Sequence, residues 1–98
     1  MIEIYDRKGL CVIFKSDLPR LRDADLRGVN LKEANLVQMD LSGADLREAN
    51  LESADLRLAN LSNTDLRGAN LNGTDLSGAN IENAQMDPAQ KVIPISVV

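Results

Sequence analysis

Residues 24–83 read ADLRG VNLKE ANLVQ MDLSG ADLRE ANLES ADLRL ANLSN TDLRG ANLNG TDLSG ANIEN, and the same five-residue pattern continues to Met86. The third place of each quintet holds Leu, until Ile81 and Met86. The first place holds Ala in nine of thirteen quintets, and the second place holds Asp or Asn until Gln85. A fixed period of this kind decides a fold before any local preference does.

A period of five fits neither a helix nor an ordinary strand, whose faces repeat every 3.6 and 2 residues. A helix would rotate successive leucines by about 140° and spread them over every side. A chain that runs briefly extended and then turns a corner keeps the small residue and the Leu on one side. We expect the corner in the two variable places, where Gly28, Gly43, Asn63 and Asn83 stand, because Gly and Asn tolerate a positive φ.

Stacked turns of such a chain form a solenoid with the apolar residues inside and the Asp or Asn outside. The expected core centres are Leu26, Leu31, Leu36, Leu41, Leu46, Leu51, Leu56, Leu61, Leu66, Leu71, Leu76, Ile81 and Met86.

These quintets resemble the pentapeptide-repeat family, whose consensus is A-(D/N)-L-x-x, over about two thirds of the chain. The resemblance implies an all-β fold, a right-handed quadrilateral β-helix with four quintets per coil. The sequence leans the same way: the Asp/Asn choice matches in six of eight comparisons twenty residues apart, but in three of nine comparisons fifteen apart.

The chain of 98 residues has a net charge of −4 and is 44% hydrophobic, which suits one small domain. We expect an N-terminal cap over residues 1–18, the β-helix over residues 19–88 and a C-terminal apolar tail over residues 89–98. It has no apolar run near the ~20 residues of a membrane helix, and its start lacks the features of a signal peptide. A cytoplasmic location without membrane contact is the resulting expectation.

The first 18 residues predict a β-hairpin-like cap. Residues 2–5 alternate apolar and polar, residues 6–9 form a turn that closes on Gly9, and residues 10–14 form a second strand. The hairpin would cover the first leucine layer or, alternatively, dock a partner. Cys11, in the second expected strand, is expected to be buried.

At the other end the register fails after Met86, and Val92–Val98 is an apolar tail interrupted by Pro94. Two outcomes remain open for this end. The tail could fold over its own last coil, or the C-terminal end could stack on a second copy or on a related repeat protein. A two-fold contact would give a closed homodimer, and stacking is favoured slightly because a short tail with a central proline matches a square end poorly.

Charged side chains recur at twenty-residue spacing on the outside. Arg27, Arg47 and Arg67 form one column beside the aspartates at 25, 45 and 65, and lateral pairing would relieve the repulsion within each column. The alternative is an arginine stripe that grips an acidic partner. Asn30, Asn50 and Asn70 are expected to form a ladder of amides bonded to one another.

Catalysis is not expected. The chain has no His and a single Cys, so nucleophile-and-base arrangements have no members, and a tube filled with Leu and Ala offers no cavity. Carboxylates on flat walls do not converge on a cation. We therefore expect no catalytic residue, no cofactor and no bound metal.

The sequence favours a non-catalytic structural or protein-interaction module that presents flat charged faces to a protein partner. In length it resembles short stand-alone family members from cyanobacteria, whose roles are mostly unassigned. The acidic C-terminal end, with Asp75, Glu82 and Asp87, keeps one alternative open, because some larger relatives are thought to mimic duplex DNA and bind DNA gyrase. A rod of ~17 Å imitates only about five base pairs, and direct nucleic-acid binding is not expected.

Overall fold

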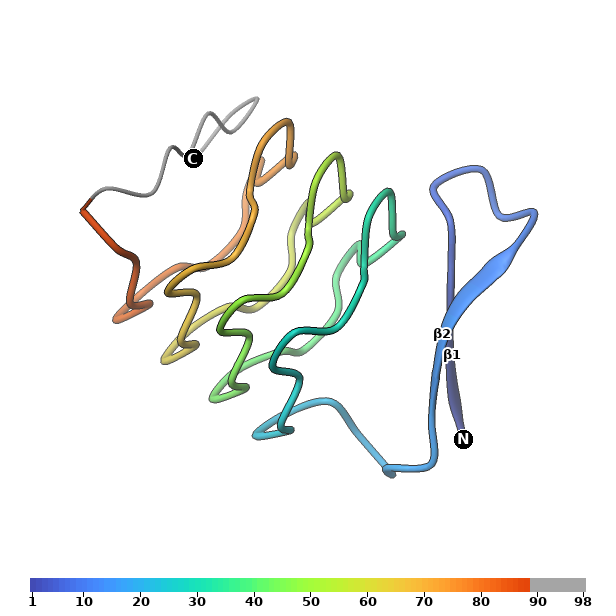
Figure 1. Cartoon of the computed structure of the whole chain (residues 1–98), viewed down its shortest axis with the longest axis horizontal. Coiled ribbons are helices and arrows are strands. Elements are labelled where there is room, and N and C mark those ends of the chain that lie inside the picture. Colours follow the sequence, from blue (N-terminus) through green and yellow to red (C-terminus); the bar gives the residue numbers. More distant parts are fainter. Residues whose placement is uncertain (89–98) are drawn as a thin grey trace.

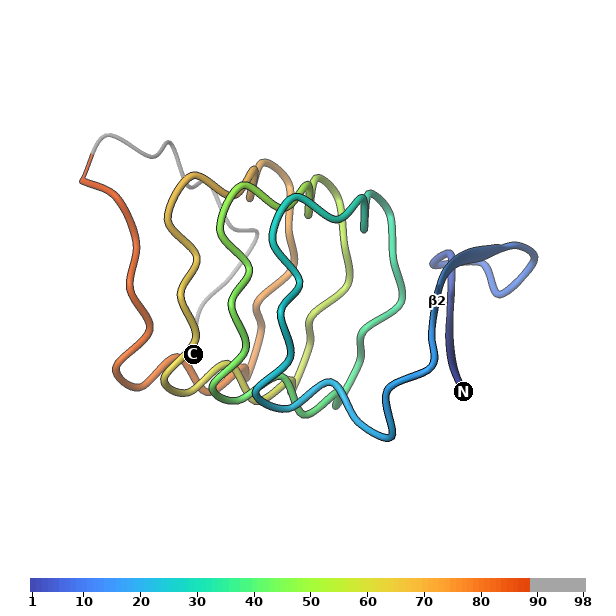
Figure 2. The ribbon, with the colours of Figure 1, turned by 60° about the horizontal axis from the view of Figure 1, so that its bottom comes forward.

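The computed structural model describes residues 1–88, which form an all-β solenoid without a helix. Two antiparallel strands, β1 (Ile2–Tyr5) and β2 (Val12–Ser16), make a hairpin at the N-terminal end. The rest of the described chain winds into successive coils stacked along one axis, as Figures 1 and 2 show from two sides. Within these residues no helix has the length and apolar character needed to cross a membrane.

Each coil contains twenty residues, because parallel bridges join residues twenty apart, from Asp25↔Asp45 to Asp65↔Gln85. Four quintets therefore complete a coil, and every quintet lies directly over the quintet four places earlier. We number the resulting stacks of quintets as four rows. Row 1 contains residues 24–28, 44–48, 64–68 and 84–88; row 2 contains 29–33, 49–53 and 69–73; row 3 contains 34–38, 54–58 and 74–78; row 4 contains 19–23, 39–43, 59–63 and 79–83.

Every backbone N–H of an inner quintet has a partner, and quintet 44–48 shows the pattern. Ala44 donates to the Leu41 carbonyl within the turn, and Asp45 donates to Ala24 in the coil before. Leu46 and Glu48 donate to Asp65 and Arg67 in the coil after. The fifth N–H, that of Arg47, donates to the Asp45 side-chain oxygen Oδ1 over 3.2 Å. Each buried backbone N–H or carbonyl without a hydrogen-bond partner would reduce the stability of the fold.

The corner of each quintet lies at its fifth residue, as expected from the sequence. All thirteen fifth residues from Asp23 to Asn83 have a positive φ. Five of them are glycines, and eight carry side chains, including Leu58 with φ 62°. Such side chains bear a conformational cost of about 1–2 kcal/mol that Gly avoids. The pairing of the coils compensates for this cost, because the N–H of the fifth residue is one of the two in each quintet that donate to the next coil.

The interior is a column of leucines flanked by small residues. Leu26 to Leu76 at the third places are at most 2% exposed, while Ile81 and Met86 in the last coil are partly buried. Thr64 and Thr74 replace Ala at the first place of their quintets and are fully buried. The Thr64 hydroxyl donates to the Leu41 carbonyl and the Thr74 hydroxyl to the Leu51 carbonyl, so neither polar group is left unsatisfied.

The hairpin packs on the N-terminal end of the stack. Ile4 of β1 is 1% exposed, and Ile2, Ile13 and Phe14 pack against the leucine column. Beyond β1, the chain pairs antiparallel with row 3 through a bridge between Asp6 and Ala34. Apolar contacts and backbone pairing together therefore tie the hairpin to the first coil.

Two expectations for the hairpin are wrong in detail. The second strand begins at Val12 rather than Leu10, and Cys11 is exposed rather than buried. The cause is the Asp6 carboxylate, which accepts hydrogen bonds from the N–H groups of both Leu10 and Cys11 and holds them in the turn. A side chain that bonds its own backbone competes with strand pairing at that point.

A matched pair of substitutions tests which side of the chain faces inward. Leu51→Asp places a lone carboxylate where no surface is exposed, and should cost several kcal/mol, enough to unfold the chain. Leu58→Asp makes the same change at a side chain that is 58% exposed, and should cost about 0.5 kcal/mol or less. Urea unfolding followed by circular dichroism measures both. Equal costs would refute the assignment of inside and outside.

Candidate functional site

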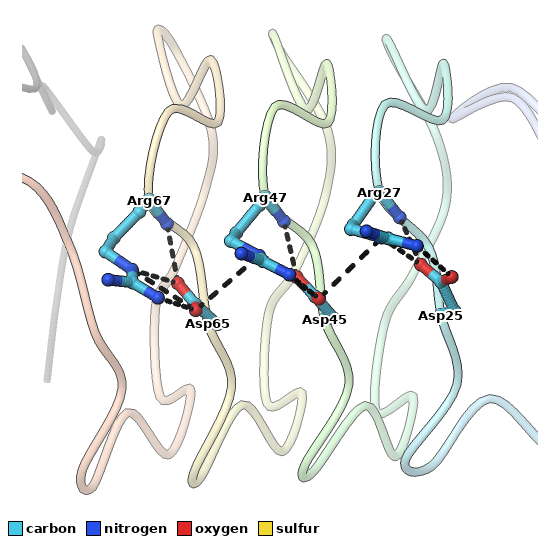
Figure 3. A network of polar contacts seen from close by, with 6 residues as sticks. All are labelled: Asp25, Arg27, Asp45, Arg47, Asp65 and Arg67. Carbon is cyan, nitrogen blue, oxygen red and sulfur yellow. Dashed lines mark hydrogen bonds and ion pairs between the residues drawn. The ribbon is translucent and has the colours of Figure 1, made fainter.

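Row 1 carries a continuous ladder of acidic and basic side chains (Figure 3). Each arginine forms a close ion pair with the aspartate two residues before it, with Nη2–Oδ2 distances of 2.8 Å at Arg27, 2.7 Å at Arg47 and 2.6 Å at Arg67. The Nε of each of these arginines also donates to the same carboxylate. The geometry is the two-pronged match between a guanidinium and a carboxylate.

The ladder also connects successive coils. Arg27 Nε lies 3.9 Å from the Asp45 carboxylate, and Arg47 Nε lies 3.8 Å from that of Asp65. Because cations and anions alternate along the row, the three arginines that the sequence placed in one column do lie together, but each is neutralised by its neighbours. We call these six residues the Asp–Arg row.

Hydrogen bonds from the arginines lower the pKa of the row's carboxyl groups. The Arg27 side chain lowers the pKa of Asp25 to about 2 from the ordinary 3.8. The Arg47 and Arg67 side chains lower the pKa of Asp45 and Asp65 in the same way, partly opposed by desolvation. The aspartates therefore stay ionised in the folded chain well below the pH at which free aspartate takes up a proton.

The second place of the quintet is less exposed than the sequence suggests. Asp55, in the middle of row 3, is only 6% exposed, which corrects the expectation that all Asp and Asn side chains point freely into solvent. Arg57 covers it, with Nη2 at 2.8 Å from Oδ2 and Nε donating to Oδ1 over 2.9 Å. These bonds outweigh desolvation and lower the pKa of Asp55.

The expected amide ladder in row 2 is wrong. Among residues 1–88 no hydrogen bond joins Asn30, Asn50 and Asn70 to one another. Their Oδ1 atoms accept instead from the backbone N–H groups two residues later, at Lys32, Glu52 and Asn72. Asp and Asn share this acceptor oxygen, and the turn that it closes is a standard role for both. The strict choice of Asp or Asn at the second place is the sequence signal from which this turn could have been predicted.

The three acidic residues of the C-terminal end lie in different rows. Asp75 belongs to row 3, Glu82 to row 4 and Asp87 to row 1. Asp75 is also engaged inside the fold, because its Oδ1 accepts from the Ser77 hydroxyl and N–H, which lowers its pKa. The three carboxylates are therefore spread around the coil rather than gathered on one face.

In the part of the chain that the structure describes, no group of three acidic or cysteine side chains is placed to hold a metal ion. The interior is filled by leucine and alanine, and the charged groups of the rows face outward.

Comparison with known proteins gives a family match across most of the coils. The model of the pentapeptide repeats matches residues 20–57 and 54–87, with eight copies. No curated protein sequence matches the chain.

Several solved structures are similar to the chain. HetL, a pentapeptide-repeat protein involved in heterocyst differentiation regulation in the cyanobacterium Nostoc, is 34% identical over 76% of this chain and 36% of its own, with a TM-score of 0.50. QnrB1, a plasmid-mediated fluoroquinolone resistance protein, is 22% identical over 70% of this chain and 38% of its own, with a TM-score of 0.42. A pentapeptide-repeat protein of the cyanobacterium Cyanothece is 32% identical over 72% of this chain and 55% of its own, with a TM-score of 0.27.

The chain thus spans little more than a third of the length of HetL and QnrB1.

The Asp–Arg row predicts a loss of stability in acid. A carboxyl whose pKa is lowered by folding contributes stability above its unfolded pKa, near 3.8, and that contribution is lost as the pH falls toward 2. The urea midpoint should fall between about pH 5 and pH 2. Asp45→Asn keeps the oxygen that accepts from the Arg47 N–H but removes the charge, so its midpoint should fall less over the same range.

The control for this measurement is Asp17→Asn, because Asp17 is exposed outside the coils and has no ion pair among residues 1–88. If Asp45→Asn and Asp17→Asn lose stability in acid as steeply as the unchanged protein, the ion pairs of the row do not contribute to the folded state.

Proposed function

This chain belongs to the pentapeptide-repeat family, and from that premise we propose that it is a non-catalytic module that presents flat, charged β-helix faces to a protein partner. One observation carries the proposal: the third place of each quintet fills the interior, while the side chains of the fourth and fifth places lie on the outside of the rows. The module has a large ordered surface and a packed core.

The geometry proposed for the coil is a right-handed β-helix with four sides. The twenty-residue spacing of the bridges supports four quintets per coil, and a corner at every fifth residue supports four edges. Each row would then be one flat face, with neighbouring coils ~4.8 Å apart. Side chains on such a face lie on a regular grid, which a second rigid surface can match.

The absence of catalysis is part of the proposal and has physical support. Catalysis needs groups with suitable pKa values that converge beside a water-excluding pocket. The aspartates with lowered pKa values are held by arginines or by hydroxyl and backbone donors, which keeps them ionised and poor as proton carriers. The likeness in fold to HetL, a pentapeptide-repeat protein involved in the regulation of heterocyst differentiation, supports this proposal.

The second candidate is a DNA mimic that inhibits or modulates a DNA-binding enzyme such as DNA gyrase. Its support is the C-terminal coil, residues 69–88, which carries Asp75, Glu82 and Asp87 and no cation. The Asp–Arg row weighs against it, because a DNA mimic needs uncompensated negative charge along its length. The interaction module is therefore preferred.

The C-terminal end offers a further contact, which we propose is an end-to-end one. Among residues 1–88, the N–H groups of Leu71, Leu76 and Ile81 donate no hydrogen bond, whereas the N–H of Leu51 one coil earlier donates to Asn70. An edge of this kind pairs readily with another chain. A two-fold contact with a second copy, or stacking with a related repeat protein, would satisfy it. The tail that was expected to compete for this edge, residues 92–98, lies outside the described residues.

Capture from an extract of the source organism, using the tagged chain, tests the interaction module. In each of four variants, the charge of one exposed side chain in one row is reversed or a positive charge is introduced. A partner that binds one flat face should no longer be captured by the variant altered on that face, and should still be captured by the other three. The four variants are Glu48→Lys, Lys32→Glu, Gln38→Lys and Asn63→Lys, in rows 1 to 4. Equal capture by all four, or equal loss, would contradict binding through one face.

The outcome that would replace the proposal with its alternative is inhibition of gyrase supercoiling by the purified chain. The interaction module requires no inhibition at tens of micromolar. Inhibition that weakens on charge reversal at Asp75, Glu82 and Asp87 would establish the DNA mimic instead.

Light scattering tests the end-to-end contact on the full chain and on a version that ends at Gln90. Stacking through the open edge predicts that the full chain scatters as a dimer, with a mass that depends on concentration. A full chain that stays monomeric at high concentration, together with a loss of stability on truncation at Gln90, would show that residues 91–98 cover the edge.

A further inference from the structure

A hollow lies where the turn of the hairpin meets the outer surface of rows 2 and 3. Its lining comes from three parts of the chain that are far apart in sequence: Asp6, Arg7 and Lys8 of the turn, Glu33 of the first coil, and Ser53, Asp55 and Arg57 of the second. The backbone fixes this juxtaposition, because the Arg7 N–H donates to the Glu33 carbonyl over 2.8 Å.

Two guanidinium groups in the lining are held in place by the fold. Arg7 Nη1 donates to the Ser53 carbonyl over 3.2 Å, an oxygen at a corner that the backbone pairing between coils leaves free. Arg57 is held by both oxygens of Asp55. Both groups line the same hollow, and the charge of Arg7 also contributes to lowering the pKa of Asp55, although the Arg57 side chain has the largest effect. Anchored guanidiniums lose little conformational freedom when they bind an anion.

Donors outnumber acceptors in this hollow. Within residues 1–88 the remaining side-chain N–H groups of Arg7 and Arg57, the Lys8 ammonium and the Ser53 hydroxyl donate to no protein atom. The Asp55 carboxylate is already used by Arg57, and the Asp6 carboxylate accepts from two N–H groups of its own turn. Of the three carboxylates in the lining, only that of Glu33 accepts no hydrogen bond and forms no ion pair within the described residues.

We propose that this hollow binds a phosphate group, free or carried on a protein side chain, through Arg7, Lys8, Arg57 and the Ser53 hydroxyl. A tetrahedral phosphate offers three strong acceptor oxygens to donors that approach from different sides, whereas a carboxylate offers two oxygens in one plane. The negative charge of Glu33 repels phosphate, so removing this charge should strengthen the binding. The inference is independent of which row binds a protein partner.

The test is a titration of the 15N-labelled full chain with sodium phosphate, at an ionic strength held constant with sodium chloride. The amide signals of Arg7, Lys8 and Ser53 should shift and saturate. Lys8→Gln should weaken binding by about two- to fivefold, and Glu33→Gln should strengthen it by a similar factor. Neither side chain is bonded within residues 1–88, so both variants should fold normally. A second arm compares a phosphoserine peptide with its serine form, and whichever of phosphopeptide and free phosphate binds more tightly identifies the source.

Lys15→Gln is the matched control, because Lys15 lies on β2 outside the hollow, 3.9 Å from Glu3. It should leave the affinity unchanged. Shifts that do not saturate, or an equal loss of affinity in Lys15→Gln and Lys8→Gln, would overturn the proposal, since either result indicates only diffuse attraction between phosphate and the lysines.

Discussion

The fold depends on a constraint that recurs in every quintet: all five backbone N–H groups need a partner, and coil-to-coil pairing supplies only three. The first residue uses the carbonyl three places back, and the second, third and fifth use neighbouring coils. The fourth N–H points outward, and the Oδ1 atom of Asp or Asn two residues earlier accepts it. Glu is too long and Ala has no acceptor, so the second place is restricted although its side chain lies on the outside.

The same constraint explains why charge appears as a ladder. Where the second residue is Asp and the fourth is Arg, the turn that satisfies the N–H also brings the guanidinium onto the carboxylate, as at Asp45 and Arg47. Where the fourth is Ser, the hydroxyl takes that place, as at Asp40 and Ser42. Twenty-residue stacking then places each arginine near the next carboxylate of its row. The Asp–Arg row is a consequence of local turn geometry repeated in register.

The leucine column and the corner at the fifth residue could be predicted from the sequence, because a period of five leaves few ways to bury one residue in five. The twenty-residue spacing was expected from the resemblance to the family, because a period of five alone does not decide how many quintets complete a coil. The role of Asn30 and the burial of Asp55 could not be predicted. Both depend on which hydrogen-bond donor the side chain pairs with, and the sequence alone is compatible with several donors. The exposure of Cys11 could not be predicted for a similar reason, because the hydrogen bonds to the Asp6 carboxylate determine where β2 begins. The hollow beside the hairpin required the structure, because Arg7 and Arg57 are fifty residues apart and meet only after the coil forms.

The two ends of the stack differ from the inner coils in their backbone partners and in their charge. An inner coil receives its backbone partners from the coils on either side, and the fourth place of its quintets holds residues as different as Arg47, Glu52 and Ser62. At the N-terminal end the hairpin supplies partners to rows 2 and 3: the Arg7 N–H donates to the Glu33 carbonyl in row 2, and the Tyr5 carbonyl accepts from the Asn35 N–H in row 3. That segment is also basic: residues 1–22 carry five cations, Arg7, Lys8, Lys15, Arg20 and Arg22, against three acids, Glu3, Asp6 and Asp17. The last described coil has three acids and no cation. Within residues 1–88 a stack built from one repeated unit therefore carries opposite net charge at its two ends, although the coils between them are alike.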